Sequence, residues 1–173
     1  YEDYLFEQWT HGAFDDYWKQ VGIYMAGFYD RYADVPVVIM SSWYDAYTRT
    51  ATENYLGLKT RKRGPVQLIL GPWTHGDRSV THAGDVDFGP DATLDGAIAP
   101  NWREFRLRWF DRFLKGIDNG ADRDPAVRIF VMGGGSGRRN AAGRLDHGGR
   151  WRAETDWPLP DTQFRAYYLH SNG

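Results

Sequence analysis

Two side chains of the sequence have the type and placement of a catalytic acid and base. Asp45 comes shortly after an apolar run at residues 37–40, and His75 comes shortly after a second apolar run at residues 66–70. When serine acts as a nucleophile, an imidazole takes the proton of the hydroxyl, and a carboxylate fixes the tautomer of that imidazole. Each residue also has a simpler interpretation, Asp45 as a helix N-cap and His75 as a turn residue. Composition alone favours the simpler interpretations, so the expected fold has to show whether the two can meet.

The elements around these residues predict that they do meet. Residues 37–40 and 66–70 are apolar at nearly every position, as in strands of a parallel sheet that are covered on both faces. A helix is expected from about residue 46 to residue 58, which makes a βαβ unit with parallel strands and a right-handed crossover. Loops after the carboxyl ends of such strands emerge at one edge of the sheet, where α/β folds place their sites. Neighbouring strands lie ~4.8 Å apart, so Asp45 and His75 are within reach of each other.

The remaining segments predict helices and a loop around this unit. Residues 1–32 carry aromatic and apolar side chains at helical spacing, which glycines interrupt. Residues 77–100 are rich in Gly, Asp, Thr and Pro and predict a long loop over the site edge. Apolar residues return at helical spacing over residues 102–114, and Gly116 predicts the end of that helix.

The pattern changes again near residue 120. Apolar and polar residues alternate over residues 127–131, and residues 164–169 form another strand candidate with no helical pattern between the two. We therefore expect a domain boundary near residue 120 and the start of an antiparallel β domain after it. So few strands cannot complete a β-sandwich, and the chain lacks an initial Met, so we interpret it as a piece of a longer protein.

Composition and charge exclude several classes of protein. The chain has 173 residues, 42% hydrophobic and 25% charged, with a net charge of -2, which is ordinary globular composition. Its one short basic run, at residues 59–63, is typical of a solvated turn, so no nucleic-acid partner is expected. No apolar run approaches the ~18 residues of a membrane helix, so no membrane association is expected. The absence of cysteine leaves the compartment open, with the cytoplasm slightly favoured.

Other motif-like features do not indicate a metal or a cofactor. The aspartates at 85, 87 and 91 lack the closing Glu of a calcium loop. His75 and His82 have no further ligands at the spacing of a zinc site. The glycine-rich residues 133–137 lack the Gly-Lys-Ser/Thr ending of a phosphate loop. We expect no metal and no cofactor, and the substrate-binding residues and the oligomeric state stay open.

Several motifs in a fixed order carry a resemblance to a known family. They are Ser42-Trp-Tyr-Asp45, Gly71-Pro-Trp-Thr-His-Gly76, Asp87-Phe-Gly89, Leu107-Arg-Trp-Phe-Asp-Arg-Phe-Leu-Lys-Gly116 and Val127-Arg-Ile-Phe-Val-Met-Gly133. In this order the chain resembles the cocaine esterase and glutaryl-cephalosporin acylase family, which includes α-amino-acid ester hydrolases and related Xaa-Pro dipeptidyl peptidases. The resemblance spans essentially the whole chain.

The resemblance implies an α/β fold made of parts of two domains. Residues 1–34 correspond to the end of a helical cap, residues 35–119 to the C-terminal part of an α/β-hydrolase domain, and residues 120–173 to the beginning of a β jelly roll. It implies a serine hydrolase that cleaves ester, amide or Xaa-Pro dipeptidyl bonds through a covalent acyl-enzyme, without a cofactor. Asp45 matches the acid of the family's triad and His75 its base, while Ser42 stands where the family usually has Gly.

The nucleophile that this pair would serve is missing from the sequence. The family places it in a Gly-x-Ser elbow between an earlier strand and helix, and none of the serines at 41, 42, 79, 136 and 171 has that context. We therefore expect the chain alone to be inactive and to need the remainder of its own protein. The substrate would be a small ester, an amide or a short peptide. The alternative is a non-catalytic binding module whose aromatic-rich surface contacts a ligand or partner.

Overall fold

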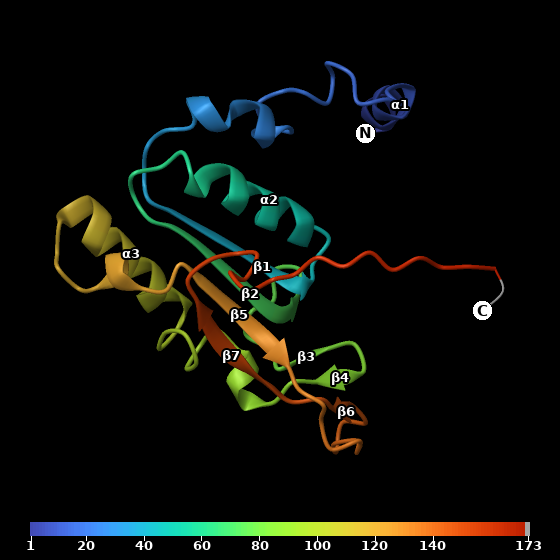
Figure 1. Cartoon of the computed structure of the whole chain (residues 1–173), viewed down its shortest axis with the longest axis vertical. Helices are drawn as coiled ribbons and strands as arrows, with labels where there is room; N and C mark the ends of the chain where they lie inside the picture. The colour runs from blue at the N-terminus through green and yellow to red at the C-terminus, as the bar shows by residue number, and fades with distance from the viewer. Residues whose placement is uncertain (172–173) are drawn as a thin grey trace.

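The structure is a computed structural model that describes residues 1–171, so the last two residues of the predicted β domain, 172 and 173, lie outside the described part. In chain order the elements are α1 (Glu2–Thr10), η1 (Met25–Arg31), β1 (Val37–Tyr44), α2 (Thr48–Lys59), β2 (Val66–Thr74), β3 (His82–Ala83), β4 (Val86–Asp87), η2 (Pro90–Ala92), α3 (Trp102–Lys115), η3 (Ala121–Arg123), β5 (Val127–Met132), β6 (Leu145–Asp146) and β7 (Gly149–Glu154), where η denotes a 3₁₀ helix. The fold belongs to the α/β class (Figure 1).

A four-stranded mixed sheet is the centre of the fold. Its strand order is β1-β2-β5-β7. β1 and β2 pair in parallel, from Val37 opposite Val66 to Tyr44 opposite Thr74. The two predicted strands are therefore neighbours, and their carboxyl ends lie at the same edge of the sheet. A second, small sheet joins β3, β4 and β6, within the loop regions beyond that edge.

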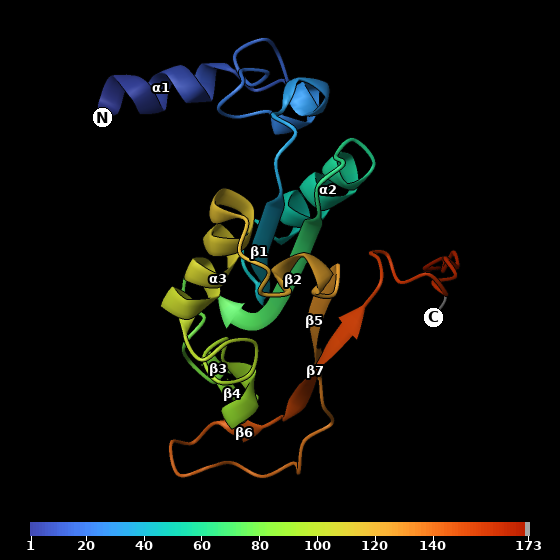
Figure 2. The ribbon, with the colours of Figure 1, turned by 90° about the vertical axis from the view of Figure 1, so that its left-hand side faces the viewer.

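Helices α2 and α3 cover opposite faces of this sheet (Figure 2). On β2, Leu68 and Leu70 pack with residues of α2, whereas Ile69, between them, packs with Phe105 of α3. All three β2 side chains have no exposed surface. Alternation of apolar residues between two covered faces explains why these strands are apolar throughout.

The predicted helix before Gly116 is present as α3. At its start, the Asn101 side chain accepts a hydrogen bond of 2.9 Å from the backbone N–H of Glu104, which is an N-cap. At its end, Gly116 has a φ of 72°, in the left-handed region that glycine adopts without strain. The end of the helix therefore matches the sequence signal of Gly116.

β5 does not begin a separate antiparallel sheet, as the alternating pattern of residues 127–131 suggested. It pairs in parallel with β2, and only β7 is antiparallel to it. The pattern predicted a strand correctly, but its partner is fixed by contacts distant in sequence. The division of the chain into domains near residue 120 stays a prediction, and the main sheet continues across that point.

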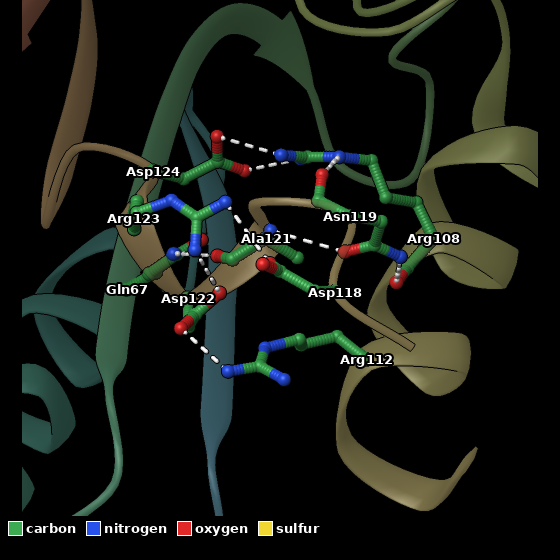
Figure 3. A network of polar contacts seen from close by, with 9 residues as sticks. All are labelled: Gln67, Arg108, Arg112, Asp118, Asn119, Ala121, Asp122, Arg123 and Asp124. Carbon is green, nitrogen blue, oxygen red and sulfur yellow. Dashed lines mark hydrogen bonds and ion pairs between the residues drawn. The ribbon is translucent and has the colours of Figure 1, made fainter. Parts of the chain in front are cut away.

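A polar network ties the segment before β5 to helix α3 (Figure 3). Arg108 of α3 binds both carboxylate oxygens of Asp124, at 2.5 and 3.2 Å, and Arg112 contacts Asp122 at 2.8 Å. From the sheet, the buried Gln67 donates a hydrogen bond of 3.2 Å to the carbonyl of Ala121. Paired, bidentate arginine contacts of this kind fix geometry as well as charge. The network sets how β5 enters the sheet beside β2.

Two expectations for the ends of the chain were wrong in part. Residues 1–32 contain α1 and η1, but the stretch between them is irregular, and the side chain of Asp15 there accepts a hydrogen bond from the backbone of Tyr17. Such a local side-chain bond competes with helix formation. Residues 164–169 form no strand, and Phe164 is 85% exposed.

No helix among residues 1–171 is long and apolar enough to span a membrane.

Candidate active site

Asp45 and His75 lie together at the carboxyl edge of the sheet. Each is the first residue after its strand, Asp45 after β1 and His75 after β2. The Nδ1 atom of His75 is 3.1 Å from the Oδ1 atom of Asp45. The proximity expected from the βαβ unit is therefore present, and it results from the parallel pairing that places Tyr44 opposite Thr74.

The carboxylate of Asp45 is held from two further sides. The backbone N–H of Tyr47 donates to Oδ1 at 2.9 Å, and the hydroxyl of Ser41 donates to Oδ2 at 3.2 Å. The Asp45 side chain is only 9% exposed. Asp45 is not the N-cap of α2, because that helix begins at Thr48 and its N-cap position is Tyr47. The carboxylate is thus oriented toward His75 by a turn that precedes the helix.

The surroundings of Asp45 favour its ionised form. Burial raises the pKa of this carboxyl, but the hydrogen bonds from Tyr47, His75 and Ser41 outweigh burial and hold the pKa below its usual value of 3.8. Asp45 is therefore a carboxylate at neutral pH. A carboxylate against Nδ1 favours the imidazole tautomer that carries its proton on that nitrogen, which leaves Nε2 able to accept a proton.

His75 is open to its surroundings, unlike its partner. Its side chain is 68% exposed, and the ring of Tyr47 stands edge-on to the imidazole with centroids 5.3 Å apart. Tyr47 thus contacts the pair twice, through its backbone N–H to Asp45 and through its ring to His75. An imidazole anchored at one nitrogen and exposed at the other can transfer a proton to or from a group that approaches it.

The serines near the pair bind other groups. Ser41 is committed to Asp45, and the buried Ser42 donates to the carbonyl of Thr74 at 3.5 Å, across the ends of β1 and β2. Ser79 donates to Asp77, and the hydroxyl of Ser136 accepts from a backbone N–H in its own loop. Where the family usually has Gly, Ser42 therefore links the strands that carry the acid and the base.

A pocket of about 180 Å³ opens beside the pair. Its lining includes Asp45, His75, Met40, Trp73 and Arg78. Sequence reasoning did not identify Arg78, whose only local signal is a basic residue three positions after His75. Within residues 1–171 there is no group of three or more His, Asp and Glu side chains placed to hold a metal ion.

Strand β2, which directly precedes His75, depends on close packing between Gly71 and Trp73. Trp73 is buried, and its indole N–H donates to the carbonyl of Ala92 at 2.7 Å. A Cβ atom on Gly71 would lie 2.5 Å from the Trp73 ring, closer than any real contact. The rigid ring has little room to move away, because interiors are close-packed.

Gly71→Ala is therefore expected to destabilise the protein by about 1–3 kcal/mol, the usual cost of overpacking a core. The measurement is the free energy of unfolding in urea. Gly134→Ala is the matched control, because no atom lies within 4 Å of its Cβ position and its φ is not positive. Equal stability of the two variants would contradict the packing argument.

The parallel strands with helices on both faces, and the Asp and His that follow neighbouring strands, define part of an α/β hydrolase. A family model described as X-Pro dipeptidyl-peptidase (S15 family) matches residues 2–77. A second, described as X-Pro dipeptidyl-peptidase C-terminal non-catalytic domain, matches residues 119–173. Cocaine esterase from Rhodococcus is 30% identical over 165 residues, which are 94% of this chain and 24% of the esterase.

Solved structures agree on the fold. Two crystal structures of a CocE/NonD family hydrolase from Staphylococcus aureus superpose with TM-scores of 0.62 and 0.58, at 18% and 17% identity. They cover 97% and 92% of this chain and 24% and 22% of that protein. The chain belongs to the cocaine esterase and X-Pro dipeptidyl-peptidase family of serine hydrolases. It spans about a quarter of the length of these relatives.

Proposed function

We propose that this chain supplies the acid and the base of a serine hydrolase that cleaves ester or amide bonds through a Ser-Asp-His triad. The observation that carries the proposal is the 3.1 Å contact between His75 Nδ1 and a carboxylate that the backbone of Tyr47 and the hydroxyl of Ser41 hold in place. The nucleophilic serine would come from a part of the protein outside these 173 residues. Asp45 would act as the triad acid and His75 as the base.

In the proposed reaction, Nε2 of His75 takes the proton of the serine hydroxyl as its oxygen attacks the carbonyl carbon of the substrate. Asp45 stabilises the imidazolium that forms, through Nδ1–H. The imidazolium then returns the proton to the leaving alcohol or amine, and an acyl-enzyme remains. The same imidazole then takes a proton from water, whose oxygen attacks the acyl carbon, and it returns that proton to the serine oxygen as the acid is released. The reaction moves protons and an acyl group, so it requires no cofactor.

The names of the relatives indicate the kinds of substrate to consider. Cocaine esterase is named for an ester, and the family models are named for dipeptidyl peptidases that act at X-Pro bonds. Both reactions are acyl transfers that use one triad in the same way. We propose a small ester, an amide or a short peptide as the substrate of the complete protein, and a β jelly roll as the fold that residues 120–173 begin.

A fluorophosphonate probe, which labels only an activated serine, tests this proposal. The complete protein is expected to be labelled, and the chain of residues 1–173 alone is expected to remain unlabelled and without esterase turnover. Labelling of the isolated chain would show that one of its own serines is the nucleophile. A complete protein that is folded but unlabelled would refute the proposed hydrolase and favour a binding module, whose aromatic surface includes Trp9 at 72% exposure.

A further inference from the structure

Arg78 brings a positive charge to the pocket that contains the acid and the base. It follows His75 by three residues and lines the same pocket of about 180 Å³. Its guanidinium carbon lies 4.0 Å from the centre of the Trp102 ring, close enough for a strong cation–π contact. The two residues join the loop after β2 to the first turn of α3.

The charge of Arg78 has no carboxylate partner within the described residues. No acidic side chain of residues 1–171 lies within ion-pair distance of it, and its Nε atom is buried without a hydrogen bond. The nearest acid in sequence, Asp77, lines the same pocket but accepts a hydrogen bond from Ser79 instead, at 3.3 Å. A partly buried cation without a counter-ion is costly, and an anion that entered the pocket would offset that cost.

The backbone and the indole hold Arg78 in a fixed orientation. Its carbonyl accepts a hydrogen bond of 3.0 Å from the backbone N–H of Leu94, and its guanidinium lies over Trp102. A guanidinium held over a ring keeps its N–H donors available at its edges, in the planar arrangement that matches a carboxylate. Because the side chain is already ordered, little conformational entropy remains to be lost when an anion binds.

We propose that Arg78 binds a carboxylate carried by the substrate, so that the enzyme prefers anionic esters or amides over neutral ones of the same shape. This inference rests on the proposed hydrolase function of Asp45 and His75. The competing explanation is structural, in which Arg78 only holds the loop against Trp102. Arg106 provides the matched control, because it also packs on Trp102, at 5.2 Å, but does not line the pocket of His75.

The test compares isosteric esters with the complete enzyme and its Arg78→Gln and Arg106→Gln variants. One pair is para-nitrophenyl hexanoate and mono-para-nitrophenyl adipate, which place a neutral or an anionic group on the acyl side. A third ester, the hexanoate of para-hydroxybenzoate, places the carboxylate on the leaving group instead. We expect Arg78→Gln to lower kcat/KM for one of the two anionic esters by about tenfold or more, as for loss of a hydrogen bond to a charged group. The anionic ester that is affected identifies the side of the substrate that Arg78 contacts.

In this variant, the ratio of kcat/KM for that anionic ester to kcat/KM for para-nitrophenyl hexanoate is expected to fall by about tenfold, because the neutral ester has no carboxylate for the guanidinium to bind. Arg106→Gln should leave the anionic-to-neutral ratio unchanged. Thermal unfolding of both variants shows whether they remain folded. An unchanged ratio in folded Arg78→Gln, or an equal fall for all three esters, would overturn the inference. Activity of the parent enzyme toward the neutral ester, lost in His75→Ala, tests the proposed function separately. A parent enzyme inactive toward all three esters would refute both.

Discussion

Replacing His75 with alanine is expected to lower kcat of the complete enzyme by about 10⁴-fold or more, as loss of a triad base does in other serine hydrolases. The physical reason is that His75 carries the imidazole held against Asp45, with Nδ1 at 3.1 Å from the carboxylate, and alanine leaves that position without a base. Burst kinetics with a chromogenic ester measure acylation directly. They should show no acyl-enzyme burst in the variant.

The control for this experiment is His82→Ala, which removes another imidazole, at the start of the short strand β3. It should keep kcat near that of the parent enzyme. Circular dichroism of both variants would show that the fold is intact, as expected for the side chain of His75, which is 68% exposed. Near-normal turnover by His75→Ala would overturn the assignment of the base.

Asp45→Asn is expected to leave the fold in place and to lower kcat by about 10²–10⁴-fold, through loss of the correct imidazole tautomer. An asparagine amide can donate to Nδ1 of His75, and the proton of the ring then sits on Nε2, where it blocks acceptance of the serine proton. Asp85→Asn, in the loop after β3, is the matched control and should have little effect on kcat. Turnover by Asp45→Asn close to that of the parent would remove Asp45 from the triad.

Asp45→Asn is also expected to change how the free energy of unfolding depends on pH. The pKa of Asp45 is lower in the folded protein than its usual 3.8, so its ionised form stabilises the fold above that pH. This contribution is lost as the pH falls below 3.8 and through the folded pKa. Asp45→Asn lacks it at every pH, so the stabilities of parent and variant should converge in acid. Unfolding in urea at neutral pH and at pH 3 or below measures this convergence.

The sheet and the acid–base pair could be predicted because their signals are local. Leu68 and Ile69 are neighbours in β2, so their side chains point to opposite faces of the sheet, and both are apolar and buried. The sequence alone therefore indicates that both faces of this strand are covered. The position of Asp45 and His75 directly after two parallel strands then follows from the connection through α2. Because loops after parallel strands emerge at one edge of the sheet, the two side chains are then expected to lie close together.

Features that depend on distant residues could not be predicted in the same way. The alternating residues of β5 show a strand, but its parallel pairing with β2 depends on α3 and on the Asp124 network. The two-residue strands β3 and β4 are too short to leave a pattern in the sequence. The contact between Arg78 and Trp102 joins a loop to a helix across 24 positions, and neither residue indicates the other.

The place of β5 in the sheet limits how the protein can be divided. β2, the strand that directly precedes His75, is paired on one side with β1 and on the other with β5. The second family model begins at residue 119, so β5 belongs to that part of the chain while its hydrogen bonds support the strand of the base. A cut at residue 119 would leave the long apolar strand β2 with an unpaired edge, the kind of surface on which chains aggregate. The boundary between the two family segments is therefore a poor place to truncate the protein for expression, because the ladder between β2 and β5 crosses it.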